Sequence, residues 1–274
     1  MTDDAATVPA GIDTTVPHPA RIYDFFLGGK DNFASDRQAA EAAIAGFPDA
    51  PLVARQNRDF MRRAAAAMVK EGIRQFIDLG SGLPTNDNLH QITQRTAPDS
   101  RVVYIDNDPI VLAHGSALLA DNKTTTVVTA DLRDPQGVFD ACEAAGIDFE
   151  QPVGLLMIAV LHFVPGDVSG LMHTYRSRLA TGSWLALSHV TADGMDPERA
   201  EQAAGTYART PSGLHYRTPE EIQALFGDSH LLEPGVVATR LWRPEAVEGL
   251  PQIGDNSRPT YPMVLAGVSR FDAA

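Results

Sequence analysis

The chain has 274 residues and a formal net charge of −13, which excludes a broad nucleic-acid-binding surface, because such a surface needs clustered basic residues. Hydrophobic residues make up 44% of the sequence, enough for a substantial core, but no apolar run reaches the roughly 18 residues that a membrane span requires. The acidic N-terminus has no signal-peptide pattern and Cys142 is the only cysteine, so we expect a cytoplasmic protein that binds neither nucleic acid nor membrane.

The first 70 residues do not alternate regularly between strands and helices. Residues 1–17 are small and acidic with two prolines, a composition typical of a disordered tail. Residues 18–70 are expected to form an extension of loops and helices, in which a helix after Pro51 ends at Gly72. The aromatic residues of this extension either form a lid over a bound ligand or pack on the helices of the sheet, and the glycines among them favour the lid. These aromatic residues are Tyr23, Phe25, Phe26 and Phe33.

From residue 71 onward, short apolar runs alternate with segments of helical pattern. Strands are predicted at about 75–79, 101–106, 125–129, 153–160 and 183–188, and two more at about 236–242 and 263–269, which could pair as a hairpin. Helices are predicted at about 85–96, from Asp108, at 135–145, at 167–179 and at 218–227, with residues 192–217 as a polar segment. This alternation predicts an α/β protein with a Rossmann-like, seven-stranded, mostly parallel sheet and helices on both faces.

Polar residues and glycines follow the predicted strands, at the edge of the sheet where ligands of open α/β proteins bind. Glycines after the first strand let a ligand touch bare backbone, and Asp78 would repel a pyrophosphate but suit the sulfonium and ammonium groups of S-adenosylmethionine. Asp106 could accept hydrogen bonds from ribose hydroxyls, and Asp131 could accept one from the adenine amine. The predicted cofactor-binding residues are Tyr23 of the lid, Asp78, Gly80, Ser81, Gly82, Asp106, Asn107, Ala130, Asp131, Leu132 and Ala159.

Six stretches, spanning roughly residues 18–165, carry a family resemblance. They are H-P-A-R-I-Y-D-F-F-L-G-G-K-D-N-F, N-R-D-F-M-R-R-A, I-R-Q-F-I-D-L-G-S-G-L-P-T, V-V-Y-I-D-N-D-P-I-V-L, A-D-L-R-D-P and V-L-H-F-V-P. They resemble the class I S-adenosylmethionine-dependent methyltransferases and, more narrowly, an uncharacterised bacterial family of S-adenosyl methyltransferases.

The resemblance implies S-adenosylmethionine as the cofactor and a methyltransferase domain over residues 71–274. It also implies that Asp78, Gly80 and Gly82 contact the methionine end of the cofactor. Asp106 is then assigned to the ribose, and Asp131 and Leu132 to the adenine. Many class I enzymes have a third glycine where this chain has Pro84, which leaves the path of the turn near the amino-acid tail open.

His162 directly follows the fourth strand, which in this fold typically faces the transferred methyl group. The histidine is either a general base with a pKa near the working pH or a cap of the following turn. Asn57 and Arg58 lie on the helix before the first strand, either on a solvated face or close enough to contact the cofactor carboxylate. No metal site is expected, because the histidines and aspartates after the fifth strand lack a tight ligand spacing.

These observations favour methyl transfer from S-adenosylmethionine to a small-molecule acceptor. Two alternatives remain. One is an S-adenosylmethionine-binding sensor or enzyme partner, which would need no strong catalytic residue. The other is an NAD(P)-dependent oxidoreductase, disfavoured by Asp78 and by the missing last glycine of G-x-G-x-x-G. The acceptor, the methylated atom and the oligomeric state are not given by the sequence.

Overall fold

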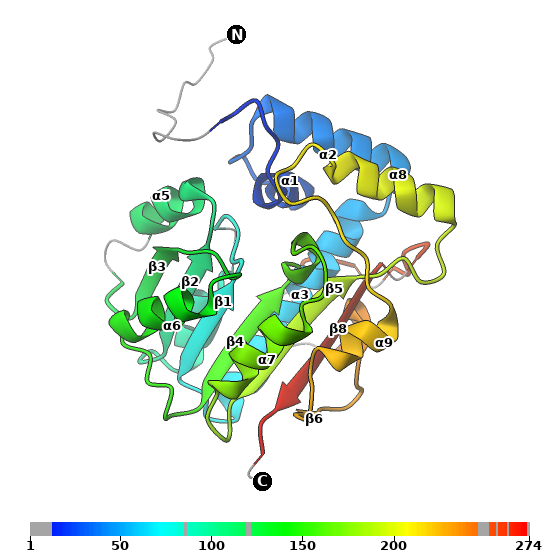
Figure 1. Cartoon of the computed structure of the whole chain (residues 1–274). Coiled ribbons are helices and arrows are strands. Elements are labelled where there is room, and N and C mark those ends of the chain that lie inside the picture. Colours follow the sequence, from blue (N-terminus) through cyan, green and yellow to red (C-terminus); the bar gives the residue numbers. More distant parts are fainter. Residues whose placement is uncertain are drawn as a thin grey trace.

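Figure 1 shows the computed structural model of the chain. It describes residues 13–84, 87–118, 122–245, 252–255, 257–261 and 263–272. Most of the expected disordered tail, residues 1–12, lies outside these ranges.

The centre of the fold is an eight-stranded sheet with the order β3-β2-β1-β4-β5-β8-β6, in which β7 also pairs with β8. The strands are β1 (Gln75–Leu79), β2 (Arg101–Asp106), β3 (Thr125–Thr129), β4 (Val153–Ile158), β5 (Trp184–Val190), β6 (His230–Leu231), β7 (Val237–Ala238) and β8 (Val264–Arg270). The first five are parallel and β8 runs antiparallel to β5, so the predicted mostly parallel α/β sheet is confirmed. The strand order reverses between β1 and β4, and this is where open sheets of this kind bind ligands.

The C-terminal part of the sheet differs in detail from the prediction. The expected hairpin between residues 236–242 and 263–269 is present as the antiparallel pair of β7 and β8. However, β7 has only two residues, because a 3₁₀ turn, η2 (Thr239–Leu241), follows it directly. The two-residue strand β6, which was not predicted, also pairs with β8 and makes the eighth strand.

Helices cover both faces of the sheet (Figure 1). One face carries α3 (Ala50–Lys70), α4 (Leu89–Thr96) and α5 (Pro109–Leu118). The other carries α6 (Pro135–Ala144), α7 (Ser169–Ser177) and α9 (Pro219–Ala224). The sequence of the central strand β4 is almost entirely apolar because both of its faces are buried. Leu155 and Met157 pack into the core on the α6–α7 face, and Leu156 packs into the core on the α3–α4 face.

A third layer of helices lies over the carboxyl ends of the parallel strands (Figure 1). It consists of α1 (Pro19–Phe26), α2 (Ala34–Gly46) and α8 (Pro197–Tyr207), which pack on one another around Ile22, Phe26 and Ala40. We call this layer the helical cap. It joins the N-terminal extension to the segment after β5, although the two are far apart in the sequence.

Helix α8 lies within residues 192–217, which were expected to be a polar segment and for which no helix was predicted. Its apolar side chains recur at helical spacing, at Ala200, Ala203, Ala204 and Tyr207, but three of the four are alanines and only Ala203 is buried, so the apolar pattern is weak. The capping signal is nevertheless present, because the Asp196 side chain accepts hydrogen bonds from the backbone N–H groups of Glu198 and Arg199, and Pro197 occupies the first turn.

Candidate functional site

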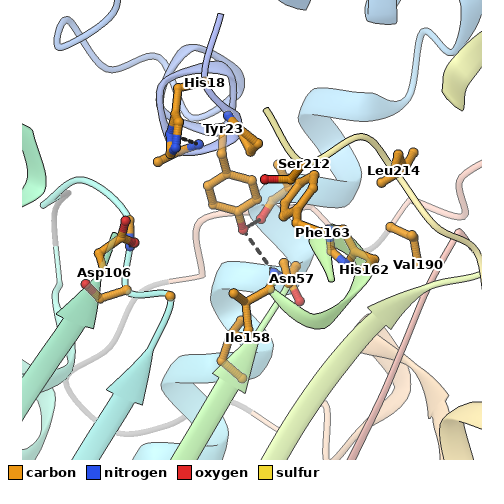
Figure 2. A pocket seen from close by; sticks show the side chains of 18 of the residues that line it. His18, Tyr23, Asn57, Asp106, Ile158, His162, Phe163, Val190, Ser212 and Leu214 are labelled. Carbon is orange, nitrogen blue, oxygen red and sulfur yellow. Dashed lines mark hydrogen bonds between the residues drawn. The ribbon is translucent and has the colours of Figure 1, made fainter. Parts of the chain in front are cut away.

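A cavity of about 230 Å³ lies between the carboxyl ends of the parallel strands and the helical cap. Figure 2 shows His18 and Asp106 at one end of it, Val190 and Leu214 at the other, and Tyr23 with Asn57 between them. Every site residue predicted from the sequence lines this cavity: Tyr23, Asp78, Gly80, Ser81, Gly82, Asp106, Asn107, Ala130, Asp131, Leu132, Ala159 and His162.

The turn after β1 brings bare backbone to the cavity. Gly80 and Gly82 have φ values of +71° and +65°, in the left-handed region that glycine adopts without strain. A Cβ atom on Gly80 would lie 2.1 Å from Cγ2 of Val160, so no other residue fits there without displacing the loop after β4. At Gly82, by contrast, a Cβ atom would meet no atom within 4 Å. The turn therefore borders open space on one side and packs tightly on the other.

Several buried polar atoms around this turn have no hydrogen-bond partner in the described part of the chain. They are Oγ of Ser81, Oδ1 of Asn57 and Nε of Arg58. Asn57 and Arg58 both line the cavity, so they do not lie on a solvated face of α3. Buried polar groups are normally paired, and such orphaned atoms beside a cavity indicate the place of a ligand or of ordered water.

Asp78 is the buried carboxylate of this region. Burial raises its pKa to about 7, an effect that Asp106 reinforces and that the nearby Arg58 guanidinium partly opposes. Arg58 itself is held in place by a hydrogen bond of 3.0 Å from Nη2 to Oδ1 of Asn88. The free protein therefore holds an acid that changes its charge close to neutral pH.

Asp106, at the end of β2, accepts two hydrogen bonds from the backbone. Its Oδ2 accepts from Gly82 N–H at 2.8 Å, and its Oδ1 accepts from Asp108 N–H at 2.9 Å. Burial raises the pKa of Asp106, although these two hydrogen bonds oppose the shift. Each carboxylate oxygen can accept a second hydrogen bond, so the group still has room for a ligand hydroxyl.

Asp131, after β3, lies at a more exposed edge of the cavity. Its carboxylate is paired with the side chain of Arg133, which donates to both oxygens and lowers the pKa of Asp131. The Leu132 carbonyl accepts a hydrogen bond of 2.6 Å from the Tyr175 hydroxyl, which fixes the loop against α7.

The end of β4 turns sharply to bring His162 into the cavity. Ala159 has a φ of +54°, a strained value for a residue with a side chain, and its N–H donates to Oγ of Ser188 at 2.9 Å. The 3₁₀ turn η1 (Leu161–Phe163) follows, and Nδ1 of His162 is buried with no hydrogen-bond partner among the described residues. Figure 2 shows the imidazole beside Phe163 and Val190.

The electrostatics of His162 differ from the sequence expectation of a pKa near the working pH. Burial lowers its pKa well below the ordinary value of 6.5, and the neighbouring His189 and Arg217 lower it further. His189 packs edge-on against His162, with a ring-centroid distance of 5.4 Å, and its own pKa is lowered to about 4, chiefly by burial. Both imidazoles are therefore neutral at physiological pH.

The helical cap is tied to the strand ends by contacts of α1. Nδ1 of His18 lies 3.1 Å from Oδ2 of Asp108, and Nε of Arg21 lies 3.6 Å from the same oxygen. The Tyr23 hydroxyl donates to the Ala54 carbonyl at 2.9 Å and accepts from Nδ2 of Asn57 at 3.0 Å, as the dashed line in Figure 2 indicates. These contacts hold α1 over the cavity. Within the described ranges, no group of His, Cys, Asp and Glu could hold a metal ion.

The family model described as S-adenosyl methyltransferase matches residues 5–272. The chain belongs to the S-adenosyl methyltransferase family. It is therefore an S-adenosylmethionine-dependent methyltransferase, and S-adenosylmethionine is its cofactor. The sequence expectations about family, cofactor and enzyme class are confirmed, and the sensor and oxidoreductase alternatives are not favoured.

Two solved structures support this family assignment. A protein from Thermobifida fusca YX, assigned as a methyltransferase, shares 39% identity and a TM-score of 0.87, with 98% of this chain and 100% of that chain covered. A DUF574 family protein from Streptomyces avermitilis MA-4680 shares 39% identity and a TM-score of 0.84, with 94% and 99% covered. The plantazolicin methyltransferase BpumL, solved with a triazolic desmethylPZN analog and SAH, has a TM-score of 0.50 at 10% identity, covers 93% of this chain and 96% of its own, and shares the fold alone. Across the described residues of this methyltransferase, no helix has both the length and the apolar character to cross a membrane.

Proposed function

We propose that this methyltransferase transfers a methyl group to a small-molecule acceptor inside the capped cavity. The observation that carries the proposal is the continuity of the cavity: the residues predicted to bind the cofactor and the histidine at the end of β4 line one space beneath α1, α2 and α8. A macromolecular acceptor would have to displace these helices, whereas a small molecule would not.

The residues around the turn after β1 fit the methionine end of S-adenosylmethionine. The Asp78 carboxylate complements an ammonium group, and the unpartnered Nε of Arg58 complements a carboxylate. The orphaned Ser81 hydroxyl and the open space at Gly82 provide further contacts with a polar tail. Asp106 would accept hydrogen bonds from the ribose, with Asn107 beside it, and the loop of Ala130, Asp131 and Leu132 would hold the adenine.

When bound, S-adenosylmethionine supplies a methyl group on a sulfonium, whose carbon–sulfur bond breaks as the bond to the acceptor atom forms, with the electron pair left on sulfur in S-adenosylhomocysteine. The neutral imidazole of His162 can accept a proton from an acceptor hydroxyl or N–H group as that bond forms. Tyr23, Asn57 and the helical cap position the reactants and exclude water.

The same proposal places the enzyme in the cytoplasm and leaves nucleic acid out of its substrates. The net charge of −13 opposes binding to a polyanion, and the lone Cys142 forms no internal disulfide, as is usual in a reducing compartment. Binding of the full-length protein to duplex DNA or to RNA at low salt would contradict this part of the proposal.

The decisive experiment has two steps. Titration calorimetry with S-adenosylhomocysteine first compares the wild type with Asp106→Ala, whose affinity should fall about ten- to a hundredfold, because hydrogen bonds to a charged acceptor are worth roughly 1.5–3 kcal/mol. Asp140→Ala, which removes an exposed carboxylate on α6, serves as the matched control. A collection of small-molecule acceptors is then screened for release of S-adenosylhomocysteine. Unchanged affinity in folded Asp106→Ala would reject the cofactor placement, and turnover only with proteins or nucleic acids would reject the small-molecule acceptor.

A further inference from the structure

We infer that the acceptor is an uncharged, largely apolar small molecule with one reacting hydroxyl or N–H group. This inference rests on the proposed function and adds the chemical class of the substrate. The structure points to this class because the part of the cavity beyond His162 is apolar and contains no charged side chain among the described residues that line it.

The far end of the cavity is formed by segments that are distant in the sequence. We call it the acceptor compartment and define it by Phe47, Val53, Val190, Leu214, Met263 and Val264. Five of these residues form one buried apolar cluster, and Leu214 packs against it. Figure 2 shows Val190 and Leu214 on the side of His162 that lies away from Asp106. The compartment is therefore separate from the polar end of the cavity.

The acidic and arginine side chains that line the cavity, and with them His18, belong to other segments. They lie on α1 or at its N-cap, on α3, or at and just after the ends of β1 to β3: His18, Asp24, Arg58, Asp78, Asp106, Asp131 and Arg133. The buried cation Arg217 is close to His162 but is not part of the lining. Its guanidinium donates to His189 on β5 and to the carbonyls of Leu161, Val164 and Gly166, so its hydrogen bonds are made within the protein.

Polar groups next to the acceptor compartment are few and neutral. They are the imidazole of His162, the hydroxyls of Tyr207 and Ser212, and the Tyr23–Asn57 pair. Burial raises the pKa of Tyr207 and lowers that of His162, so neither carries a charge at neutral pH. They can orient one heteroatom of an acceptor, but they cannot neutralise an ion.

An ionised acceptor would lose its hydration in this compartment without gaining a counterion. Burial of an unpaired charge is far more costly than burial of a neutral polar group that keeps a hydrogen bond. An apolar molecule, by contrast, gains from the removal of its surface from water. The compartment should therefore discriminate by charge between acceptors of equal shape.

A matched pair of probes tests this inference. The full-length protein is first saturated with S-adenosylhomocysteine, whose binding is measured separately. Fluorescence titration then compares 2-naphthol with 6-hydroxynaphthalene-2-sulfonate, which has the same ring system and hydroxyl group but carries a permanent negative charge. We expect saturable binding of 2-naphthol and at least tenfold weaker binding of the sulfonate.

Substitutions of Leu214 test whether the probes bind in the acceptor compartment. Leu214→Asp places a carboxylate in the acceptor compartment and should weaken 2-naphthol binding at least tenfold, while the affinity for S-adenosylhomocysteine stays within twofold of the wild type. The uncharged Leu214→Asn should have a smaller effect. Leu241→Asp, at an exposed leucine of η2, is the matched control and should change neither affinity.

The outcomes distinguish the inference about the acceptor class from the proposed placement of the cofactor. Equal binding of both probes, tighter binding of the sulfonate, or no saturable binding of either overturns the inference about acceptor class, even when S-adenosylhomocysteine binds normally. Failure to bind S-adenosylhomocysteine rejects instead the cofactor placement on which the proposed function rests. If Leu214→Asp does not fold, the two probes on the wild-type protein decide the matter alone.

Discussion

Arg217 donates a hydrogen bond of 2.6 Å from Nη1 to Nε2 of His189. Because an arginine cannot accept, Nε2 of His189 must be the unprotonated nitrogen, and the proton is on Nδ1, which donates to the Val190 carbonyl at 2.7 Å. The same guanidinium holds three carbonyls of the loop that carries His162. Arg217 is thus the residue that fixes the geometry of the end of β4 and of its histidine.

Arg217→Ala should lower the free energy of unfolding by at least about 2 kcal/mol, because buried acceptors that lose their donor cost roughly 1–3 kcal/mol each. Urea denaturation followed by circular dichroism measures the loss. Arg270→Ala, which removes an exposed ion pair with Asp272, is the control and should cost no more than about 1 kcal/mol. Equal effects of the two substitutions would show that Arg217 does not organise this loop.

Cofactor affinity should depend on pH through Asp78, whose pKa is raised to about 7 in the free protein. The ammonium group of S-adenosylhomocysteine favours the ionised carboxylate, so binding requires loss of the proton. Affinity should be nearly constant above about pH 8 and should fall by up to about tenfold per unit as the pH drops below 7. Calorimetry between pH 6 and pH 8.5 measures this change.

Asp78→Asn is the control for this prediction. It should bind S-adenosylhomocysteine more weakly than the wild type at pH 8, with little further change down to pH 6. A raised pKa also means that Asp78 favours the folded state at low pH, and that this contribution is lost as the pH rises from about 4 to 7 in the cofactor-free protein. An affinity profile of Asp78→Asn that matches that of the wild type would assign the pH dependence to another group.

The binding residues at the strand ends could be predicted from the sequence because each lies within a few residues of the strand that positions it. The apolar run of β1, the acid at Asp78 and the glycine turn lie within eight consecutive residues, from Gln75 to Gly82, and the parallel register then brings Asp106 to the same edge. A pattern that is short in sequence and repeated at strand ends is enough to predict a common edge of a sheet.

The acceptor compartment could not be predicted in this way. Phe47, Val190, Leu214 and Met263 are ordinary apolar residues on separate segments, and only the packing of the cap and of β8 on β5 brings them together. The pKa of His162 depends in the same way on tertiary burial and on Arg217, fifty-five positions further along the chain. Helix α8 has only alanines and Tyr207 at its apolar positions and buries only Ala203, so its capping signal at Asp196 was the clearest local indication.

Saturation with S-adenosylhomocysteine should slow amide hydrogen exchange in residues 20–33. Helix α1 is held over the cavity by His18, Arg21 and Tyr23, and a ligand beneath it would have to be released or exposed when it opens. At a ligand concentration about 100 times the Kd, exchange through this opening should slow by up to about a hundredfold. Mass spectrometry measures the change, with α7, which covers one face of the sheet and does not line the cavity, as the internal control. Unchanged exchange in residues 20–33 would show that this segment is a fixed part of the packing and not a lid.

Turnover should depend on His162 as a proton acceptor once an acceptor substrate is known. The ring lines the cavity and is neutral, so one of its nitrogens has a lone pair for a proton from a hydroxyl or N–H group beside it. A positioned base contributes roughly 10²–10⁴-fold to the rate when its pKa lies near the working pH, and the low pKa of His162 places its contribution at the lower end of this range. His162→Gln, which keeps a polar side chain of similar size, should therefore lower kcat by about a hundredfold and leave the affinity for S-adenosylhomocysteine nearly intact. The pH dependence of turnover distinguishes His162 from Asp78. Because the pKa of His162 is low, this residue should cause no loss of activity between pH 6 and pH 8. A fall in activity below about pH 7 is therefore assigned to Asp78 and should persist in His162→Gln. A variant that retains the wild-type kcat would leave His162 as a structural residue of the turn after β4.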